Sequence, residues 1–322
     1  MNRYNRQIMV PEFGANGQAK LEAAHVLVIG AGGLAAPVLM YLVGAGVGKI
    51  TLVDPDIVEL GNLHRQPLFV MSDIGQAKVL AAKARLATLN PETTLLAINA
   101  ALTPNNVGDL IKGADIIVDA ADSFAVSYIL SDQCLKTQTP LISASVLGQT
   151  GYVGGFCGLN PSLRAVFPAL PENDLSCVTA GVLGPSVGVV GAMQAQICIQ
   201  VIIGAKPSPM GRLTTVDLVT YRFGGFDFHG ASEPTFYFPF IGKLDIDESD
   251  LVIELRSTEE AANPVVPWAL RGLPELEIDP YNLHERRVVL CCKSGLRAWR
   301  AANELQAQGL KRLALLALDC AQ

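Results

Sequence analysis

The sequence predicts a parallel, doubly wound α/β sheet followed by a smaller α/β domain. Short apolar runs alternate with helical patterns from residue 26 onward. These runs carry apolar residues at consecutive positions, which suits strands that are buried on both faces. A glycine-rich turn follows the first run, and a second strand–turn–helix pattern lies near the C-terminus. Together these features indicate two α/β units in one chain.

The elements of the first unit follow from the hydrophobic pattern. We expect strands at residues 26–29, 50–53, 95–98, 116–118 and 141–142, and helices at 34–43, 76–86 and 126–135. After Gly148, glycine-rich extended segments precede a long apolar helix that begins near Pro185 and ends before Gly204. Residues 213–228 then indicate strands joined by a tight turn at Gly224-Gly225.

The long apolar helix has the composition of a membrane span. Residues 180–205 contain no charged side chain. Three glutamines, at positions 194, 196 and 200, would each be costly in lipid without a polar partner. We therefore expect a helix buried within the protein, and no membrane contact.

The domain boundary is expected near residue 240. We place the first domain at 1–228, a linker at 229–243 and the second domain at 244–322. The linker begins in a stretch that contains glycine, serine and two prolines. A chain of 322 residues is long enough for one large domain and one small one.

Composition narrows the class of protein and its compartment. The formal net charge of −6 argues against an electrostatic nucleic-acid binder, which is usually basic. The seven cysteines include no C-x-x-C pair, which fits reduced thiols in a cytosolic protein; they are Cys134, Cys157, Cys177, Cys198, Cys291, Cys292 and Cys320. No signal peptide is evident at the N-terminus, so we expect a cytoplasmic location.

A nucleotide site is predicted where the first strand turns into the first helix. Gly30, Gly32, Gly33 and Ala35 satisfy G-x-G-x-x-G/A, in which glycines allow a tight turn and close backbone approach to phosphates. Asp54 ends the second strand, where a carboxylate can bond ribose hydroxyls. This pattern alone also suits an NAD-dependent oxidoreductase, which remains one alternative.

The residues after Asp54 favour a triphosphate over a nicotinamide. Asp56 is followed by Asn62, Arg65 and Lys78, which supply an amide and two cations that suit phosphate oxygens. Asp122 follows a later strand, at the sheet edge where ligands gather, and a carboxylate there can hold Mg²⁺. We therefore expect ATP and Mg²⁺.

These motifs in combination resemble the ThiF/MoeB/HesA family of ubiquitin-activating-like adenylyltransferases. The resemblance rests on residues 3–7, 30–35, 54–56, 62–66, 75–78 and 119–122, and covers roughly residues 1–228. It implies a Rossmann-like sheet and adenylylation of the C-terminal glycine of a small ubiquitin-like sulfur-carrier protein that ends in Gly-Gly. Molybdopterin and thiamine biosynthesis are among the pathways that use such carriers.

The resemblance also implies roles for individual residues. Asp54 would bind ribose, and Asp122 would bind Mg²⁺. Phosphates would be bound by Asn62, Arg65 and Lys78. Arg6 would reach into the partner's ATP site across a homodimer. Because both arginines would contact the ATP, Arg6 and Arg65 are expected to be catalytic.

Two further features concern a thiol and a metal. Cys177 matches a cysteine that some relatives use as an acceptor of the activated carboxylate or of sulfur, and the alternative is a packed thiol.

Relatives usually carry two C-x-x-C pairs that bind zinc, but residues 162–165 and 230–239 contain no cysteine. Because structural zinc needs about four nitrogen or sulfur ligands, we expect no zinc site and a loop held by packing.

A sulfur site is predicted near the C-terminus. Cys292 is expected in the turn between a strand and the helix 296–308, where backbone N–H groups and the helix dipole favour an anion. Lys293 and Arg297 add positive charge, which favours a thiolate, and Gly295 lets the loop curl. A buried thiol at a strand end is the alternative for Cys292.

The loop Cys292-Lys293-Ser294-Gly295-Leu296-Arg297 resembles the active-site loop of rhodanese-like sulfurtransferases, whose cysteine carries a persulfide. The resemblance extends to an opening strand at 251–255 and a helix around Glu259-Glu260. Glu254 replaces the more frequent Asp, and the chain lacks the Gly-Gly segment that closes such domains, so the domain is shortened.

Both resemblances together imply adenylylation followed by sulfur transfer to give a thiocarboxylate. The sulfur would come from a donor such as a cysteine desulfurase and pass through Cys292. One alternative is an adenylyltransferase whose shortened rhodanese-like domain is not catalytic. The other is the NAD-dependent Rossmann oxidoreductase.

Overall fold

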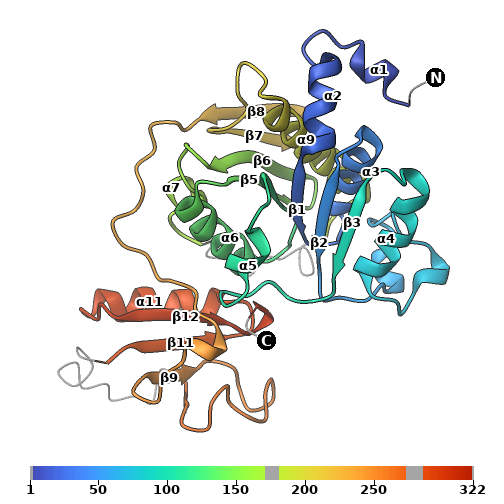
Figure 1. The fold of residues 1–322 in the computed structure, drawn as a ribbon. Helices are drawn as coiled ribbons and strands as arrows, with labels where there is room; N and C mark the ends of the chain where they lie inside the picture. The colour runs from blue at the N-terminus through green and yellow to red at the C-terminus, as the bar shows by residue number, and fades with distance from the viewer. Residues whose placement is uncertain (1–2, 171–180, 273–285, 321–322) are drawn as a thin grey trace.

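Two sheets organise the protein in a computed structural model that describes residues 3–170, 181–272 and 286–320 (Figure 1). The large sheet has eight strands in the order β3-β2-β1-β4-β5-β6-β7-β8. Its strands are β1 (His25–Ile29), β2 (Lys49–Val53), β3 (Thr94–Ile98), β4 (Ile116–Asp119), β5 (Pro140–Leu147), β6 (Thr150–Cys157), β7 (Arg212–Asp217) and β8 (Arg222–Asp227). The first five strands pair in parallel and the last three antiparallel, so the sequence prediction of a doubly wound sheet is confirmed.

Helices cover both faces of the large sheet. One core joins the sheet to α2 (Gly14–Ala23), α3 (Ala35–Ala45), α4 (Lys78–Leu89) and α9 (Gly184–Ile203). The other joins it to α5 (Val107–Ile111), α6 (Phe124–Thr137) and α7 (Leu163–Val166). Short α1 (Asn5–Ile8) precedes α2, and 3-10 turns occur at η1 (Leu60–Asn62) and η2 (Met71–Asp73). The expected helices are thus present with slightly different ends.

The hairpin between β7 and β8 turns at a different place from the one predicted. Residues 218–221 form the turn, and Asp217 accepts hydrogen bonds from the backbone N–H groups of Val219 and Thr220. Gly224 and Gly225 lie inside β8 instead. A Cβ on Gly225 would lie 2.2 Å from the carbonyl oxygen of Leu213, so the glycine serves close strand approach.

The long apolar helix α9 meets the length and composition of a membrane-crossing helix. Its inner face packs on α3, β5 and β6. Val187, Val190 and Cys198 on that face are buried, whereas Val189 on the outer face is 37% exposed. The sequence led us to expect burial within the chain, and this holds for one face of the helix.

The smaller sheet is all parallel and has the order β10-β9-β11-β12. Its elements are β9 (Leu251–Glu254), β10 (Leu270–Arg271), β11 (Val288–Cys292), α11 (Leu296–Ala307), β12 (Leu313–Ala317), η3 (Lys243–Asp245) and η4 (Leu318–Cys320). Residues 258–260 form a turn, so the helix expected around Glu259-Glu260 is absent from this described segment. Cys292 is the last residue of β11 and not part of the following turn.

The small domain lies against the end of the large sheet near α5 (Figure 1). Phe240 pairs with Leu315 of β12, and Asn105, in the loop after β3, donates to Asp245 at 3.0 Å. A Cβ on Gly242 would overlap the amide of Asn105. A continuous apolar core also joins α6 to the inner side of β11 and β12. The carboxyl ends of the first parallel strands therefore face the small domain.

Candidate functional site

The glycine-rich turn lies between the carboxyl ends of β1 and β4, the topological switch point of the sheet. Gly30 has φ +95°, and a Cβ there would lie 2.7 Å from the carbonyl oxygen of Ala120. A Cβ on Gly33 would lie 2.7 Å from Cγ1 of Val187 in α9. Side chains are excluded at both positions, which leaves the backbone of the turn accessible from the sheet edge.

Asp54 holds this turn in place. Its Oδ2 accepts from the N–H of Ala31 at 2.7 Å, and its Oδ1 from the N–H of Asp56 at 2.8 Å. Burial raises the pKa of Asp54 above its usual value, against the lowering effect of these hydrogen bonds and of Lys78. The carboxylate predicted to bind ribose therefore also positions the glycine turn.

Lys78 starts α4 with its ammonium directed to the same edge. Its side chain is 7% exposed and forms an ion pair of 2.8 Å with Asp56, whose side chain is 62% exposed. The backbone N–H of Lys78 also donates to the carbonyl of Asp56. The structure thus brings together three predicted site residues, Asp54, Asp56 and Lys78.

Asn62 and Arg65 lie on the segment that returns to the glycine turn. Asn62 Oδ1 accepts from Glu59 N–H and caps η1, while Arg65 donates to the carbonyl of Gly61 at 3.0 Å. Gln66, which follows them, is 2% exposed, and its Oε1 has no hydrogen-bond partner in the described part of the chain. A Cβ on Gly32 would lie 3.8 Å from Gln66 Nε2, so this unpaired buried amide adjoins the glycine turn.

The strand β4 places two carboxylates at the site in different environments. Asp119 is fully buried and accepts from Ser143 Oγ at 2.7 Å. Its burial raises its pKa to about 6. Asp122 is exposed, as a metal-binding carboxylate should be. Gln194 of α9 donates to the carbonyl of Asp119 at 2.7 Å.

The sequence motifs 62–66 and 119–122 include Gln66 and Asp119, but neither residue was given an individual role, and Gln194 was singled out only as costly in lipid. The one local signal for Asp119 is a carboxylate that directly follows three apolar residues of a buried strand. No local pattern marks the two glutamines, because their neighbours come from distant parts of the chain.

Two predicted residues do not join this site within the chain. Arg6 lies on α1, and the neighbouring Tyr4 is hydrogen-bonded to Asn90 and Glu92, which precede β3 at its amino end. Arg6 is therefore at the opposite end of the sheet from the glycine turn (Figure 1). Cys177 lies outside the described residues.

The Cys292 loop has the expected donors around its sulfur. Cys292 Sγ accepts from the N–H of Gly295 at 3.1 Å and of Ala298 at 3.4 Å. Gly295 has φ +87° and starts α11. The thiol has no exposed surface, and the Phe240 ring lies against Gly295, where a Cβ would be 2.8 Å from the ring.

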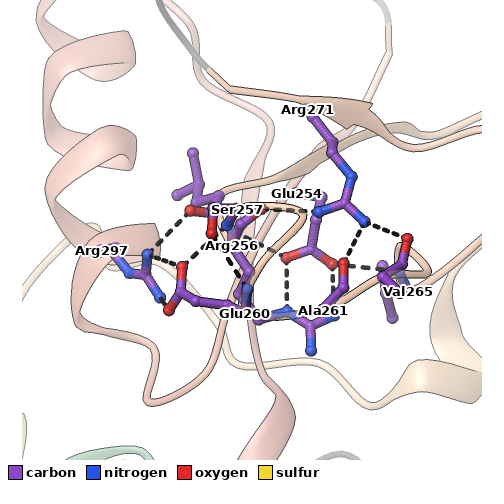
Figure 2. A network of polar contacts seen from close by, with 10 residues as sticks. Glu254, Arg256, Ser257, Glu260, Ala261, Val265, Arg271 and Arg297 are labelled. Carbon is purple, nitrogen blue, oxygen red and sulfur yellow. Dashed lines mark hydrogen bonds and ion pairs between the residues drawn. The ribbon is translucent and has the colours of Figure 1, made fainter.

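Arg297 is paired with an acidic side chain, which the prediction did not include. It forms two hydrogen bonds with Glu260, at 2.6 and 2.8 Å, and one with the carbonyl of Leu255 (Figure 2). The hydrogen bonds from Arg297 lower the pKa of Glu260 to about 2. Lys293 and Ser294 are exposed at the tip of the loop. The charge of Arg297 is thus balanced by Glu260.

Glu254 anchors the neighbouring part of this network (Figure 2). Its buried carboxylate accepts from Arg256 at 2.7 and 2.9 Å and from the N–H of Val265. Burial raises the pKa of Glu254, but the hydrogen bonds and charge of Arg256, together with the N–H of Val265, outweigh burial and hold it below its usual value. Arg271 donates to the carbonyls of Arg256 and Ala261. Glu254, which replaces the Asp that is more frequent in rhodanese-like domains, thus has hydrogen-bond partners for both of its carboxylate oxygens.

The segments that hold cysteine pairs in zinc-binding relatives are joined here by polar contacts. Ser162 donates to Glu233 through its N–H at 2.7 Å and its hydroxyl at 2.5 Å. Arg164 pairs with Asp132 at 2.6 Å and stacks on Tyr128 and Tyr237. Apolar packing was expected to hold this loop, but charged hydrogen bonds hold it as well. Among the described residues, no group of three or more His, Cys, Asp or Glu side chains could bind a metal ion.

Comparison with known proteins assigns the large domain. The model of the ThiF family matches residues 4–234. The chain belongs to the ThiF family. That match contains every predicted nucleotide-site residue and ends before the Cys292 domain.

Similar proteins agree with the ThiF assignment. The chain is 44% identical over 218 residues to "Adenylyltransferase and sulfurtransferase uba4" of Emericella nidulans, covering 64% of this chain and 45% of that protein. It is 42% identical to "Adenylyltransferase and sulfurtransferase MOCS3" of Bos taurus, covering 69% and 50%. The chain therefore spans about half the length of these relatives.

A solved structure of Escherichia coli MccB with MccA-N7isoASN superposes on the chain with a TM-score of 0.63. The two sequences are 25% identical, and the match covers 73% of this chain and 74% of that one. The superposition confirms the Rossmann-like α/β fold expected for a ThiF-family protein.

Proposed function

We propose that this protein uses ATP to adenylylate the C-terminal glycine of a small ubiquitin-like sulfur carrier and then transfers sulfur to it. One observation carries the proposal: in a ThiF-family chain, the glycine turn, Asp54, Lys78 and Asp122 converge on one sheet edge. The names of the uba4 and MOCS3 relatives combine the same two activities.

The residues at this edge fit ATP and Mg²⁺. Gly30 and Gly33 leave the backbone of the turn free of side chains for phosphates, and the amide nitrogen Nε2 of buried Gln66, a hydrogen-bond donor, adjoins that turn. Asp122 is an exposed carboxylate, the ligand type that Mg²⁺ prefers. When bound, Mg²⁺ would neutralise phosphate charge.

Adenylylation needs positioning and positive charge. A carboxylate oxygen of the carrier attacks the α-phosphorus, the bond to the β-phosphate oxygen breaks, and pyrophosphate leaves. Lys78 and Arg65 stabilise the charge that develops on the phosphates. Lys78 is held for this task by Asp56, from which a phosphate oxygen can take over one hydrogen bond.

Sulfur transfer would follow at Cys292. The outer sulfur of a Cys292 persulfide, loaded by a donor such as a cysteine desulfurase, attacks the acyl carbon and AMP leaves. The product is a carrier–Cys292 acyl disulfide. A second thiol, from Cys177 or an external thiol reductant, attacks the Cys292 sulfur and releases the thiocarboxylate. An external reductant then reduces the remaining disulfide.

A homodimer is part of the proposal. Helix α1, which carries Arg6, lies at the opposite end of the sheet from the nucleotide edge of its own chain, which supports a role for Arg6 in a partner's site. The outer face of α9 offers an apolar surface, including exposed Val189 and half-buried Met193 and Ile199, with no charged residue. Cytoplasmic location, as expected from the reduced thiols, completes the proposal.

Pyrophosphate exchange tests the adenylylation step. The full chain is incubated with ATP, labelled pyrophosphate and a panel of carriers that end in Gly-Gly. We expect carrier-dependent exchange, which Lys78→Ala lowers at least about 100-fold because a charge-stabilising group is removed. Lys83→Ala, an exposed position on the same helix, is the control. Absence of exchange with every carrier, or reduction of an added nicotinamide dinucleotide, would contradict the proposal.

A second candidate function is adenylylation with a small domain that only binds a partner. The complete burial of Cys292 favours this alternative. A persulfide assay on wild type and Cys292→Ala separates the two. Sulfur transfer retained by Cys292→Ala would rule out the assigned role of this cysteine.

A further inference from the structure

The Cys292 loop is connected to the nucleotide edge by a short series of contacts. The N–H of Asp319 donates to the carbonyl of Lys293 at 3.0 Å. The next residue, Cys320, places Sγ 3.6 Å from Ser123 Oγ. Ser123 directly follows Asp122 and immediately precedes α6. The tip of the Cys292 loop is thus connected to Asp122, the predicted Mg²⁺ ligand, through two contacts, Lys293–Asp319 and Cys320–Ser123.

The charges along this series face one another across the domain boundary. Burial raises the pKa of Asp319, and the negative charges of Asp122 and Asp56 raise it further, whereas Lys293 lowers it. Both Lys293 and carboxylates of the large domain are therefore within electrostatic range of Asp319. In the described residues, Lys293 is exposed and forms no salt bridge.

The position of the small domain is held by more than this one contact. Asn105 binds Asp245, Gly242 packs against Asn105, and Phe240 pairs with Leu315. The two Asn105 contacts start from the loop after β3, at the same edge of the large sheet as the glycine turn, whereas the Phe240–Leu315 pair joins the linker to β12. The small domain, which carries Lys293, is therefore held against the nucleotide edge of the large sheet by Asn105 as well as by the Cys320–Ser123 contact.

We propose that Lys293 contacts the phosphates of the nucleotide bound in the large domain, so that the small domain contributes a positioning residue to the adenylylation site. Lys293 adjoins Cys292, so the contact would hold the sulfur-bearing loop beside the activated carboxylate. It would also make nucleotide affinity depend on domain placement. This inference rests on the proposed function, because it assumes that the large domain binds ATP.

Charge reversal at two lysines of the small domain tests the inference. Equilibrium binding of ATP with Mg²⁺, and of adenosine, is measured with the full chain as wild type, Lys293→Glu and Lys311→Glu. Lys311 is an exposed lysine that precedes β12, at the opposite end of the small sheet from Lys293. We expect Lys293→Glu to weaken ATP binding about five- to twenty-fold, as for one partly screened charge pair that becomes repulsive. Adenosine binding should be unchanged in both variants.

Each other outcome has a defined meaning. Equal weakening by Lys293→Glu and Lys311→Glu would indicate a general effect of net charge and overturn the inference. ATP affinity unmoved by Lys293→Glu, in a wild type that binds ATP, overturns this inference alone. A wild type that binds no ATP overturns the proposed function together with it. Circular dichroism of Lys293→Glu, and the milder Lys293→Ala, checks that a loss of affinity does not come from misfolding.

Discussion

Lys78 and Asp56 form an ion pair of 2.8 Å in which the lysine is buried and the aspartate is largely exposed. A nucleotide phosphate at the sheet edge would compete with Asp56 for the same ammonium. The pair therefore links the stability of the free protein to its affinity for an anion.

Asp56→Asn tests this competition. Loss of the carboxylate leaves the Lys78 charge without its partner, and we expect the free energy of unfolding to fall by about 1 kcal/mol, given the exposure of Asp56. Saturating ATP should then raise the melting temperature of Asp56→Asn more than that of wild type, because a bound ligand stabilises the folded state according to its affinity. Thermal unfolding with and without ATP measures both effects.

Asp227→Asn is the matched control, since it breaks an ion pair with Arg212 in which both side chains are half exposed. It should change neither melting temperature appreciably. A smaller ATP-induced increase in Asp56→Asn than in wild type would indicate instead that Asp56 itself helps to hold the nucleotide.

The buried carboxylate of Asp119 predicts a specific pH dependence. Burial raises its pKa to about 6 from its usual value of 3.8, so the folded state binds more protons than the unfolded state between these values. Stability from this group is therefore lost as pH rises from about 4 to about 6, by about 3 kcal/mol from the size of the shift.

Asp119→Asn removes this titration. The free energy of unfolding of the variant minus that of wild type should be more positive at pH 7.5 than at pH 4.5. Urea unfolding of both proteins at both pH values measures this difference. Asp109→Asn, at an exposed position on α5, is the control. A stability difference that is the same at both pH values would show that burial of Asp119 does not penalise its charge.

Polar contacts at the loop around Ser162 and Arg164 predict that stability does not depend on zinc. Arg164→Ala leaves the partly buried carboxylate of Asp132 without its partner, and should lower the free energy of unfolding by about 3 kcal/mol. A strong metal chelator should leave the melting temperature of wild type unchanged. Arg222→Ala, on exposed β8, is the control variant. A melting temperature lowered by chelator would contradict the predicted absence of zinc.

The central part of the fold was predictable from sequence because the strands β1, β2 and β4 of the large sheet are apolar and buried. Runs such as β1 and β4 are buried along nearly their whole length, so local pattern and tertiary environment agree. The β7–β8 turn was mispredicted because the Gly224-Gly225 pair suits both a turn and close strand packing. Here Asp217 makes the turn, and Gly225 approaches Leu213.

The site was predictable as a set of residues but not as a set of contacts. Gly30, Asp54 and Lys78 were selected because their positions relative to strand ends follow from spacing. The pairing of Arg297 with Glu260 joins residues 37 apart in sequence, and local pattern cannot reveal it. It gives one of the two cations that were expected beside Cys292 a carboxylate partner of its own.

Phe240 covers the loop that holds Cys292, and its removal should expose the thiol. The ring lies against Gly295, whose N–H donates to Cys292 Sγ, and Cys292 has no exposed surface. We expect Phe240→Ala to increase the rate at which iodoacetamide alkylates Cys292 by about 10-fold or more, since reaction then needs less local opening.

Mass spectrometry of the Cys292 peptide follows the rate, with buried Cys134 as an internal reference for global unfolding. Phe236→Ala is the control, because Phe236 is in the same linker and 42% exposed. Equal acceleration at Cys134 would indicate loss of the fold, and an unchanged rate at Cys292 would show that another group closes the loop.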